Sequence, residues 1–132
     1  MSTELSAITD RLRELGLLVR VRGDLPRRVD GVTDDSRAAN AATLFVAVRG
    51  SVRDGHDYLP TVEAQGTPAV IVEDESRTKL PAIVVNDARR AAAAAAAVRH
   101  GDPARKVQIV GVTGTNGKTT TVGLLRHLLD SA

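Results

Sequence analysis

The sequence predicts an α/β protein: a small N-terminal α/β domain with a mixed sheet, followed by the start of a second α/β domain. Short apolar runs rich in Val and Ile alternate with segments of helical periodicity, which is the pattern of strands interleaved with helices. Aromatic residues make up only 2% of a chain that is 42% hydrophobic, so the core must be built from Val, Ile, Leu and Ala. Near the end of the chain, a glycine-rich turn joins an apolar run to another helical pattern.

The first helix is predicted at residues 5–15, where leucine and isoleucine recur at helical spacing and Gly16 ends the pattern. A second helix is expected over residues 58–65, ended by Gly66. Five apolar segments have the length and composition of buried strands. These segments are residues 17–21, 29–33, 44–48, 69–72 and 83–85.

A third helix is predicted over residues 88–100. Asp87 is a good N-cap for it, because its carboxylate can accept a backbone N–H of the first turn. Residues 91–97 are an unbroken run of alanine, the residue with the highest helix propensity, and small side chains let a helix approach a sheet closely. Gly101 and Pro103 then end the helix. We expect the domain boundary just before Asp87, which divides the chain into residues 1–86 and 87–132.

Residues 107–121 have the pattern of a phosphate-binding loop. The apolar segment 107–112 resembles a buried strand, a turn with two glycines leads to Lys118 and Thr119, and leucines at helical spacing follow. In such loops, backbone N–H groups at a helix N-terminus and a lysine ammonium converge on phosphate oxygens, while the neighbouring hydroxyl binds Mg²⁺. The alternative is a glycine-rich turn with an incidental lysine. The order of strand, turn, lysine and helix favours phosphate binding.

The glycines of this loop depart from the usual pattern G-x-x-x-x-G-K-[ST]. With residues 117–119 as its end, that pattern would place a glycine at Val112, whereas the glycines here are Gly111 and Gly114. Only one helix's worth of sequence follows the loop, although a nucleotide-binding α/β domain needs several more strands and helices. We therefore interpret the chain as the front part of a longer protein, ending in the truncated start of a P-loop ATPase domain.

Charge and composition argue against several other classes of protein. A net charge of +2 and the scarcity of aromatic residues do not fit a nucleic-acid-binding protein. The chain has no cysteine, which excludes disulfides and thiolate metal sites. No apolar run approaches the length of a membrane span, and the N-terminus does not read as a secretory leader. We therefore expect a cytoplasmic protein without membrane insertion.

Four short motifs occur in an order that resembles the N-terminal part of a bacterial Mur ligase. They are Thr-Asp-Asp-Ser-Arg at residues 33–37, Leu-Phe-Val-Ala-Val-Arg-Gly at 44–50, Asp-Gly-His at 54–56 and Gly-Thr-Asn-Gly-Lys-Thr-Thr-Thr at 114–121. The glycine placement that fails the general phosphate-loop pattern is the form that this family uses. The resemblance covers residues 29–129 and is greatest to the ligases that add the third residue of the peptidoglycan stem peptide. Ala42 and Thr43 depart from the family, which usually has a glycine and an acidic residue there.

The resemblance implies that the first domain binds the UDP end of UDP-N-acetylmuramoyl-L-alanyl-D-glutamate. Carried over by position, the contacts fall on Asp34, Ser36, Ser51, Val52 and Arg53. A serine hydroxyl and loop backbone groups can pair with the polar edge of uracil, and Arg53 can face the pyrophosphate. In the alternative interpretation, residues 35–36 only cap a turn and Arg37 only pairs with a neighbouring aspartate. His56 is expected to cap or pack against the next helix rather than to act in catalysis.

The resemblance also implies a ligase that uses ATP and Mg²⁺. Lys118 would be the catalytic residue that stabilises charge on the transferring phosphoryl group, and Thr119 would hold the metal. The residues expected to bind ATP are Gly114, Thr115, Asn116, Gly117, Lys118, Thr119 and Thr120. The implied chemistry activates a substrate carboxylate as an acyl phosphate, which the amine of diaminopimelate or lysine then attacks. Because the amino-acid site would lie in missing domains, we expect this chain alone to be inactive.

Three other interpretations stay open at this point. A sister Mur ligase, which adds D-Ala-D-Ala, has a similar front domain but more often carries serine at the position of Thr115 and lysine at that of Val122. The chain can also be read as a non-catalytic nucleotide-sugar-binding module with a vestigial phosphate loop. A P-loop GTPase is disfavoured, because those proteins place the loop near the N-terminus.

Overall fold

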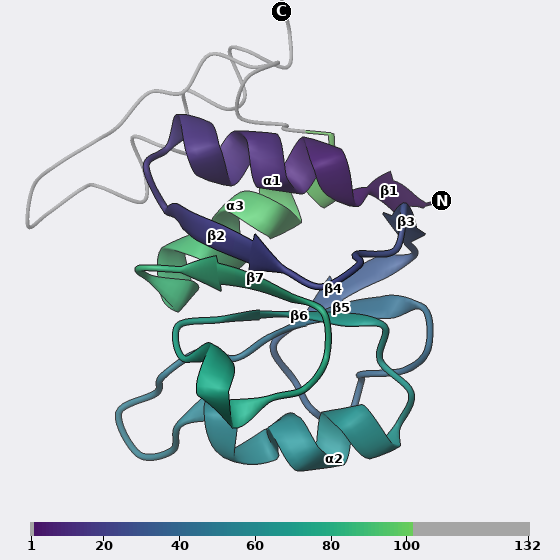
Figure 1. Cartoon of the computed structure of the whole chain (residues 1–132), viewed down its shortest axis with the longest axis vertical. Coiled ribbons are helices and arrows are strands. Elements are labelled where there is room, and N and C mark those ends of the chain that lie inside the picture. The colour runs from purple at the N-terminus through teal and green to yellow at the C-terminus, as the bar shows by residue number, and fades with distance from the viewer. Residues whose placement is uncertain (1, 102–132) are drawn as a thin grey trace, which may run out of the picture.

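The computed structural model describes residues 2–101 and shows a mixed sheet between two layers of helix (Figure 1). The predicted phosphate loop and the helix after it lie outside the described residues. In chain order the elements are β1 (Thr3–Glu4), α1 (Leu5–Glu14), β2 (Leu18–Arg22), β3 (Arg28–Val29), β4 (Gly31–Thr33), β5 (Thr43–Val46), the 3₁₀ turn η1 (Gly55–Tyr58), α2 (Leu59–Ala64), β6 (Ala69–Val72), the 3₁₀ turn η2 (Glu75–Arg77), β7 (Ala82–Val85) and α3 (Ala88–Arg99).

The main sheet has five strands in the order β2-β7-β6-β5-β4. Strands β4 to β7 run parallel, whereas β2 pairs antiparallel with β7, so the prediction of a mixed sheet is confirmed. The register places Phe45 beside Val70 and Ile71 beside Ile83. Since the parallel strands share one direction, the loops that follow β4, β5 and β6 all leave from the same edge of the sheet.

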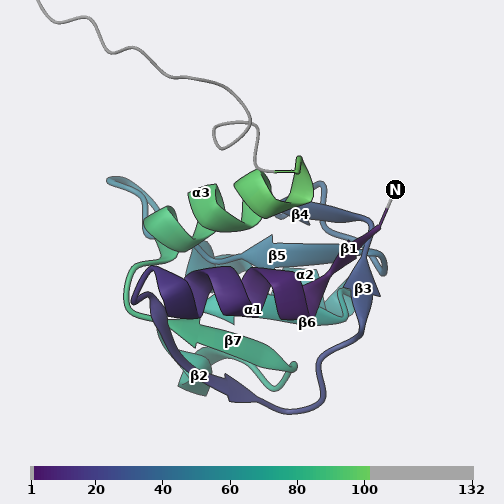
Figure 2. The ribbon, with the colours of Figure 1, turned by 90° about the horizontal axis from the view of Figure 1, so that it is seen from above.

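The central strands are buried on both faces, and their alternating side chains build two cores. On one face Leu44, Val46 and Ile71 pack beneath α1 and α3, which lie side by side (Figure 2). On the other face Phe45 and Val70 pack against α2. Strands buried on both faces read as continuous apolar runs rather than alternating ones, which is why β5, β6 and β7 could be located from the sequence.

The apolar spacing located α1 correctly, but the helix ends at Glu14, one residue earlier than predicted. Leu5, Ile8 and Leu12 are buried, whereas Leu15 follows the helix and is 46% exposed. Gly16 then takes a left-handed φ of 72°, a conformation that glycine adopts without steric cost, and it ends the helix.

Helix α3 begins as the sequence predicts: the carboxylate of Asp87 accepts the backbone N–H of Arg90 at 3.1 Å. The buried face consists of Ala88, Ala91, Ala94 and Ala95. This face belongs to the same core as α1, although the sequence placed α3 at the opening of the second domain. Where a second domain begins stays a prediction, because the chain beyond Gly101 lies outside the described part.

One predicted strand is divided in the structure, and one predicted helix is confirmed with slightly shorter bounds. The expected strand at residues 29–33 is divided at Asp30, because β3 pairs antiparallel with β1 whereas β4 pairs parallel with β5. The expected helix at residues 58–65 is confirmed as α2, which directly follows the turn η1 and starts at Leu59 with Pro60 in its first turn. Proline is favoured there because its missing N–H is not needed by the helix.

Candidate functional site

An open cleft of about 570 Å³ lies where β4 and β5 end. One wall is the loop that follows β4, and the other comes from the end of the loop after β5 and from η1. The cleft is lined by Asp34, Asp35, Ser36, Arg37, Arg53 and Tyr58. Ligands of open α/β sheets bind outside the carboxyl ends of the strands, and the described cleft occupies that position.

The cleft brings together three residues that the sequence assigned to substrate binding, namely Asp34, Ser36 and Arg53. These residues come from two loops that are separated by the whole of β5. The other two assigned residues, Ser51 and Val52, do not line the cleft, and Val52 is 90% exposed at the loop tip. Their role stays a prediction.

The first wall is shaped by a turn around Asp35. Its carboxylate Oδ1 accepts the backbone N–H of Arg37 at 2.9 Å, and the Arg37 guanidinium donates to both carboxylate oxygens at 3.1 and 3.0 Å. Hydrogen bonds from this guanidinium hold the pKa of Asp35 below its ordinary value. Asp35 therefore caps a turn and Arg37 pairs with it, as the alternative interpretation expects, and both residues also line the cleft. Ser36 lies between them in the wall of the cleft.

Arg53 carries a positive charge into the cleft from the opposite wall. Its Nη1 donates to the phenol oxygen of Tyr58 at 2.9 Å. Among residues 2–101 the structure gives Arg53 this neutral partner and no carboxylate, whereas the charge of Arg37 is already matched by Asp35. A positive group without a counter-charge at the edge of an open cleft is suited to an anionic ligand.

A smaller hollow of about 220 Å³ adjoins the cleft at Asp34, which lines both. Its walls are the end of β4, Val46 and the small side chains of Ala92 and Ala96 on α3. The alanine run therefore does more than allow close packing, because it leaves space between α3 and the sheet. A hollow lined mainly by apolar side chains and by one carboxylate can accept a flat, partly polar group.

Two glycines fix the loop that bears Arg53. A Cβ added to Gly55 would lie 2.6 Å from the backbone nitrogen of Val48 and 2.7 Å from its oxygen. At Gly50 it would lie 2.8 Å from the backbone oxygen of Arg53, whose carbonyl also accepts the Gly50 N–H. The backbone of the loop thus folds back on itself more tightly than any other residue type would permit.

His56 does not point into the cleft. It is 1% exposed and packs beneath the loop, where its ring bonds to Asp54 and to the backbone after β6. The described contacts of His56 are thus structural ones, and its absence from catalysis stays a prediction.

The residues predicted to bind ATP and Mg²⁺, from Gly114 to Thr120 and including Lys118 and Thr119, lie outside the described residues. Within residues 2–101, no group of three or more His, Cys, Asp or Glu side chains is arranged to hold a metal ion. No helix in that same part of the chain has the length and apolar character needed to cross a membrane.

Comparison with known proteins identifies the family. The model of the Mur ligase family, catalytic domain, matches residues 28–116. The chain belongs to the Mur ligase family. This match begins in β3, runs through both walls of the cleft and α3, and includes the first residues of the predicted phosphate loop.

Relatives within the Mur ligase family share 42% and 46% identity with the chain. The first is the UDP-N-acetylmuramoyl-L-alanyl-D-glutamate–2,6-diaminopimelate ligase of Geobacter sulfurreducens, 42% identical over 92% of this chain and 25% of its own length. The second is the UDP-N-acetylmuramyl-tripeptide synthetase of Deinococcus radiodurans, 46% identical over 79% of this chain and 22% of its own length. The chain thus spans about a quarter of the length of the curated relatives that it matches.

The fold is also found in a solved Mur ligase structure. UDP-N-acetylmuramoylalanyl-D-glutamyl-2,6-diaminopimelate–D-alanyl-D-alanyl ligase from Acinetobacter baumannii aligns with a TM-score of 0.67 and 24% identity, over 92% of this chain and 26% of that one. At this identity the likeness supports the fold alone.

Three residues that line the cleft were not assigned to substrate binding from the sequence: Asp35, Arg37 and Tyr58. The sequence predicts Tyr58 at the start of a helix, whereas Tyr58 ends η1 and its hydroxyl oxygen accepts a hydrogen bond from Arg53. A signal was present, because it is the chain's single tyrosine and lies five residues after the loop residue assigned to the pyrophosphate.

Proposed function

We propose that this chain binds the UDP end of UDP-N-acetylmuramoyl-L-alanyl-D-glutamate for a ligase of the tripeptide-forming (MurE) type. Such a ligase adds the third amino acid of the peptidoglycan stem peptide. The observation that supports this most directly is the shared cleft, which is lined by both Ser36 and Arg53, a cation without a described carboxylate partner. The relatives that are 42% and 46% identical to the chain bear the names of tripeptide-forming ligases. These names favour that branch of the family over the one that adds D-Ala-D-Ala.

The two ends of a nucleoside diphosphate suit different parts of the cleft. Arg53 is placed to bond the diphosphate, because a guanidinium forms strong charge-assisted hydrogen bonds to phosphate oxygens. The Ser36 hydroxyl and the polar groups around Asp34 suit the uracil edge, which both donates and accepts hydrogen bonds. The hollow beside Asp34 offers room for the flat ring.

The second half of the proposed function rests on the sequence of residues 114–120 and on the family. There Lys118 would stabilise charge on the transferring phosphoryl group, and Thr119 would hold Mg²⁺. ATP would supply the phosphoryl group that converts a substrate carboxylate into an acyl phosphate. The amine of diaminopimelate or lysine would then attack the acyl carbon, form the amide and release phosphate.

Titration calorimetry of the 132-residue chain tests the binding half of this proposal. The ligands are UDP-N-acetylmuramoyl-L-alanyl-D-glutamate, UDP, uridine and ATP. We expect the sugar nucleotide and UDP to bind, uridine to bind more weakly because it lacks the diphosphate, and ATP not to bind. Absence of sugar-nucleotide binding would overturn the proposal, and so would ATP binding without UDP binding.

A further inference from the structure

The loop tip that carries Ser51, Val52 and Arg53 depends on its base for its position. The tip is exposed, and within it the N–H of Gly50 donates to the carbonyl of Arg53 at 2.8 Å. The base is formed by Arg49 and Asp54, which pair as an isolated antiparallel bridge. Whatever fixes these two residues therefore also sets where the Arg53 guanidinium lies.

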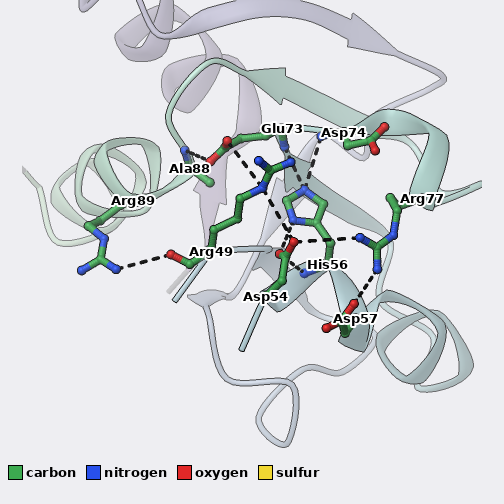
Figure 3. Close-up of polar contacts among 9 residues, drawn as sticks. All are labelled: Arg49, Asp54, His56, Asp57, Glu73, Asp74, Arg77, Ala88 and Arg89. Carbon is green, nitrogen blue, oxygen red and sulfur yellow. Dashed lines mark hydrogen bonds and ion pairs between the residues drawn. The ribbon is translucent and has the colours of Figure 1, made fainter. Parts of the chain in front are cut away.

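His56 links Asp54 of this base to the backbone just after β6 through hydrogen bonds of its ring (Figure 3). Its Nε2 accepts the backbone N–H groups of Glu73 and Asp74 at 3.1 and 3.3 Å. Because Nε2 is an acceptor, the ring hydrogen is on Nδ1, which donates to Asp54 Oδ1 at 2.7 Å. The loop base and the segment after β6 are thus connected through one buried imidazole.

Glu73 connects the same base to α3. Its Oε2 accepts the backbone N–H of Ala88, in the first turn of α3, at 3.0 Å. Its Oε1 lies 3.8 Å from Nε of Arg49, which is also 3.7 Å from Asp54 Oδ2. Arg89, one residue further along α3, donates to the backbone oxygen of Arg49 at 3.4 Å. Figure 3 shows these side chains converging between the loop, the end of β6 and α3.

We propose that Glu73 is a positioning residue for the substrate, because its carboxylate holds Arg49 and so places the Arg53 loop relative to the cleft. The carboxylate serves two partners at once, a helix N–H through one oxygen and the Arg49 guanidinium through the other. This proposal rests on the proposed function, since it takes Arg53 as the diphosphate contact. Glu73 itself does not line the cleft, so its effect on the ligand is transmitted through the loop.

The substitution Glu73→Gln removes the ion pair with Arg49 and keeps the hydrogen bond to α3. A glutamine oxygen still accepts the Ala88 N–H, and the backbone N–H groups of residues 73 and 74 still donate to the His56 ring. Only the negative charge that attracts Arg49 is lost. Since partly exposed ion pairs contribute up to about 1 kcal/mol, we expect UDP to bind about two- to fivefold more weakly. Uridine, which has no diphosphate to meet Arg53, should bind with unchanged affinity. A general loss of protein stability would instead weaken the binding of UDP and of uridine by the same factor.

Glu75→Gln is the matched control. Glu75 lies on the same β6–β7 connection, has a side chain that is 26% exposed against 23% for Glu73, and also pairs with an arginine, Arg20. Its partner is on β2, away from the cleft, so UDP affinity should not change. The double variant Arg49→Ala with Glu73→Gln should bind UDP no more weakly than the weaker single variant, because both changes remove the same contact.

Backbone amide NMR shifts of Ser51, Val52 and Arg53 in the ligand-free chain give a second measurement. We expect these shifts to change in Glu73→Gln and to stay unchanged in Glu75→Gln. Unchanged loop shifts, or equal weakening of UDP and uridine, would overturn the positioning role. If the wild-type chain fails to bind UDP while the loop shifts respond as expected, the proposed function fails and the support of the loop by Glu73 stands.

Discussion

Arg53 is the residue that we propose to contact the anionic part of the ligand in the cleft. Its one described hydrogen-bond partner among residues 2–101 is the neutral Tyr58 phenol, and Arg37 across the cleft is already paired. Hydrogen bonds to charged groups contribute roughly 1.5–3 kcal/mol, so we expect Arg53→Ala to weaken UDP binding by about tenfold or more. Tyr58 is the only tyrosine and the chain has no tryptophan, so intrinsic fluorescence can follow the titration at the cleft itself.

Arg20→Ala provides the control for that measurement. Arg20 is an exposed arginine on β2 whose guanidinium pairs with Glu75 at 2.7 Å. Its removal deletes one positive charge without touching the cleft, so it accounts for any general effect of net charge. Equal loss of UDP affinity in the two variants would contradict a specific role for Arg53.

Gly55 is required for a steric reason that can be tested separately. An added Cβ would lie within 2.7 Å of two backbone atoms of Val48, which cannot move aside as a side chain can. We expect Gly55→Ala to lower the free energy of unfolding by about 1–3 kcal/mol, measured by urea denaturation. Gly31→Ala is the control, because its Cβ would make only an ordinary contact of 3.6 Å with Thr43. A Gly55→Ala variant as stable as Gly31→Ala would show that the loop relaxes more easily than we infer.

Among the elements, α3 decides how much of the chain forms the first folded unit. Its four buried alanines pack in the core shared by α1, Leu44 and Ile71. We expect a chain ending at Gly101 to unfold cooperatively on heating, as judged by circular dichroism. A chain ending at Asn86 lacks α3 and should lose that transition, because one face of the sheet is left partly uncovered. A cooperative transition in the shorter chain would instead support a boundary before Asp87.

Local sequence patterns located most elements, but they could not determine pairing partners. The buried strands β5, β6 and β7 were predictable because consecutive β-branched residues suit strands covered on both faces. The division of residues 29–33 was not, since it depends on β1 and β5, which lie elsewhere in the chain. The packing of α3 against this sheet could not be predicted for the same reason: an alanine run predicts a helix but not which sheet it covers.

The candidate site shows the same limit. Ser36 and Arg53 were predicted from motifs in the sequence, and the fold places them in one cleft. Tyr58 was missed, because its position depends on how η1 turns away from the loop. The link from Glu73 to Arg49 was also beyond sequence reasoning, because the two residues lie far apart in the chain. Contacts between segments far apart in the chain leave no local pattern.

For the molecule as a whole, acidic side chains on several loops are stabilised in their charged form. The Arg37 guanidinium lowers the pKa of Asp35, the Ser76 hydroxyl lowers that of Asp74, and Arg20 lowers that of Glu75. At Asp54, burial raises the pKa, but hydrogen bonds from His56 and the charge of Arg49 together outweigh it, so the net shift is downward. Asp35 stabilises the cleft wall and Asp54 the loop base, whereas Asp74 and Glu75 stabilise the connection between β6 and β7.

A downward shift of these pKa values predicts acid sensitivity. The stabilisation is fully present above the unfolded-state pKa values of roughly 4, and it is lost as the pH falls through the lower folded-state values, because the unfolded chain then binds more protons. We therefore expect the thermal midpoint to vary little between pH 6 and 8 and to fall steadily below about pH 4. Asp35→Asn should reduce the pH dependence and weaken the turn that places Ser36. A midpoint that stayed constant down to pH 3 would show that the loop carboxylates contribute nothing to the folded state.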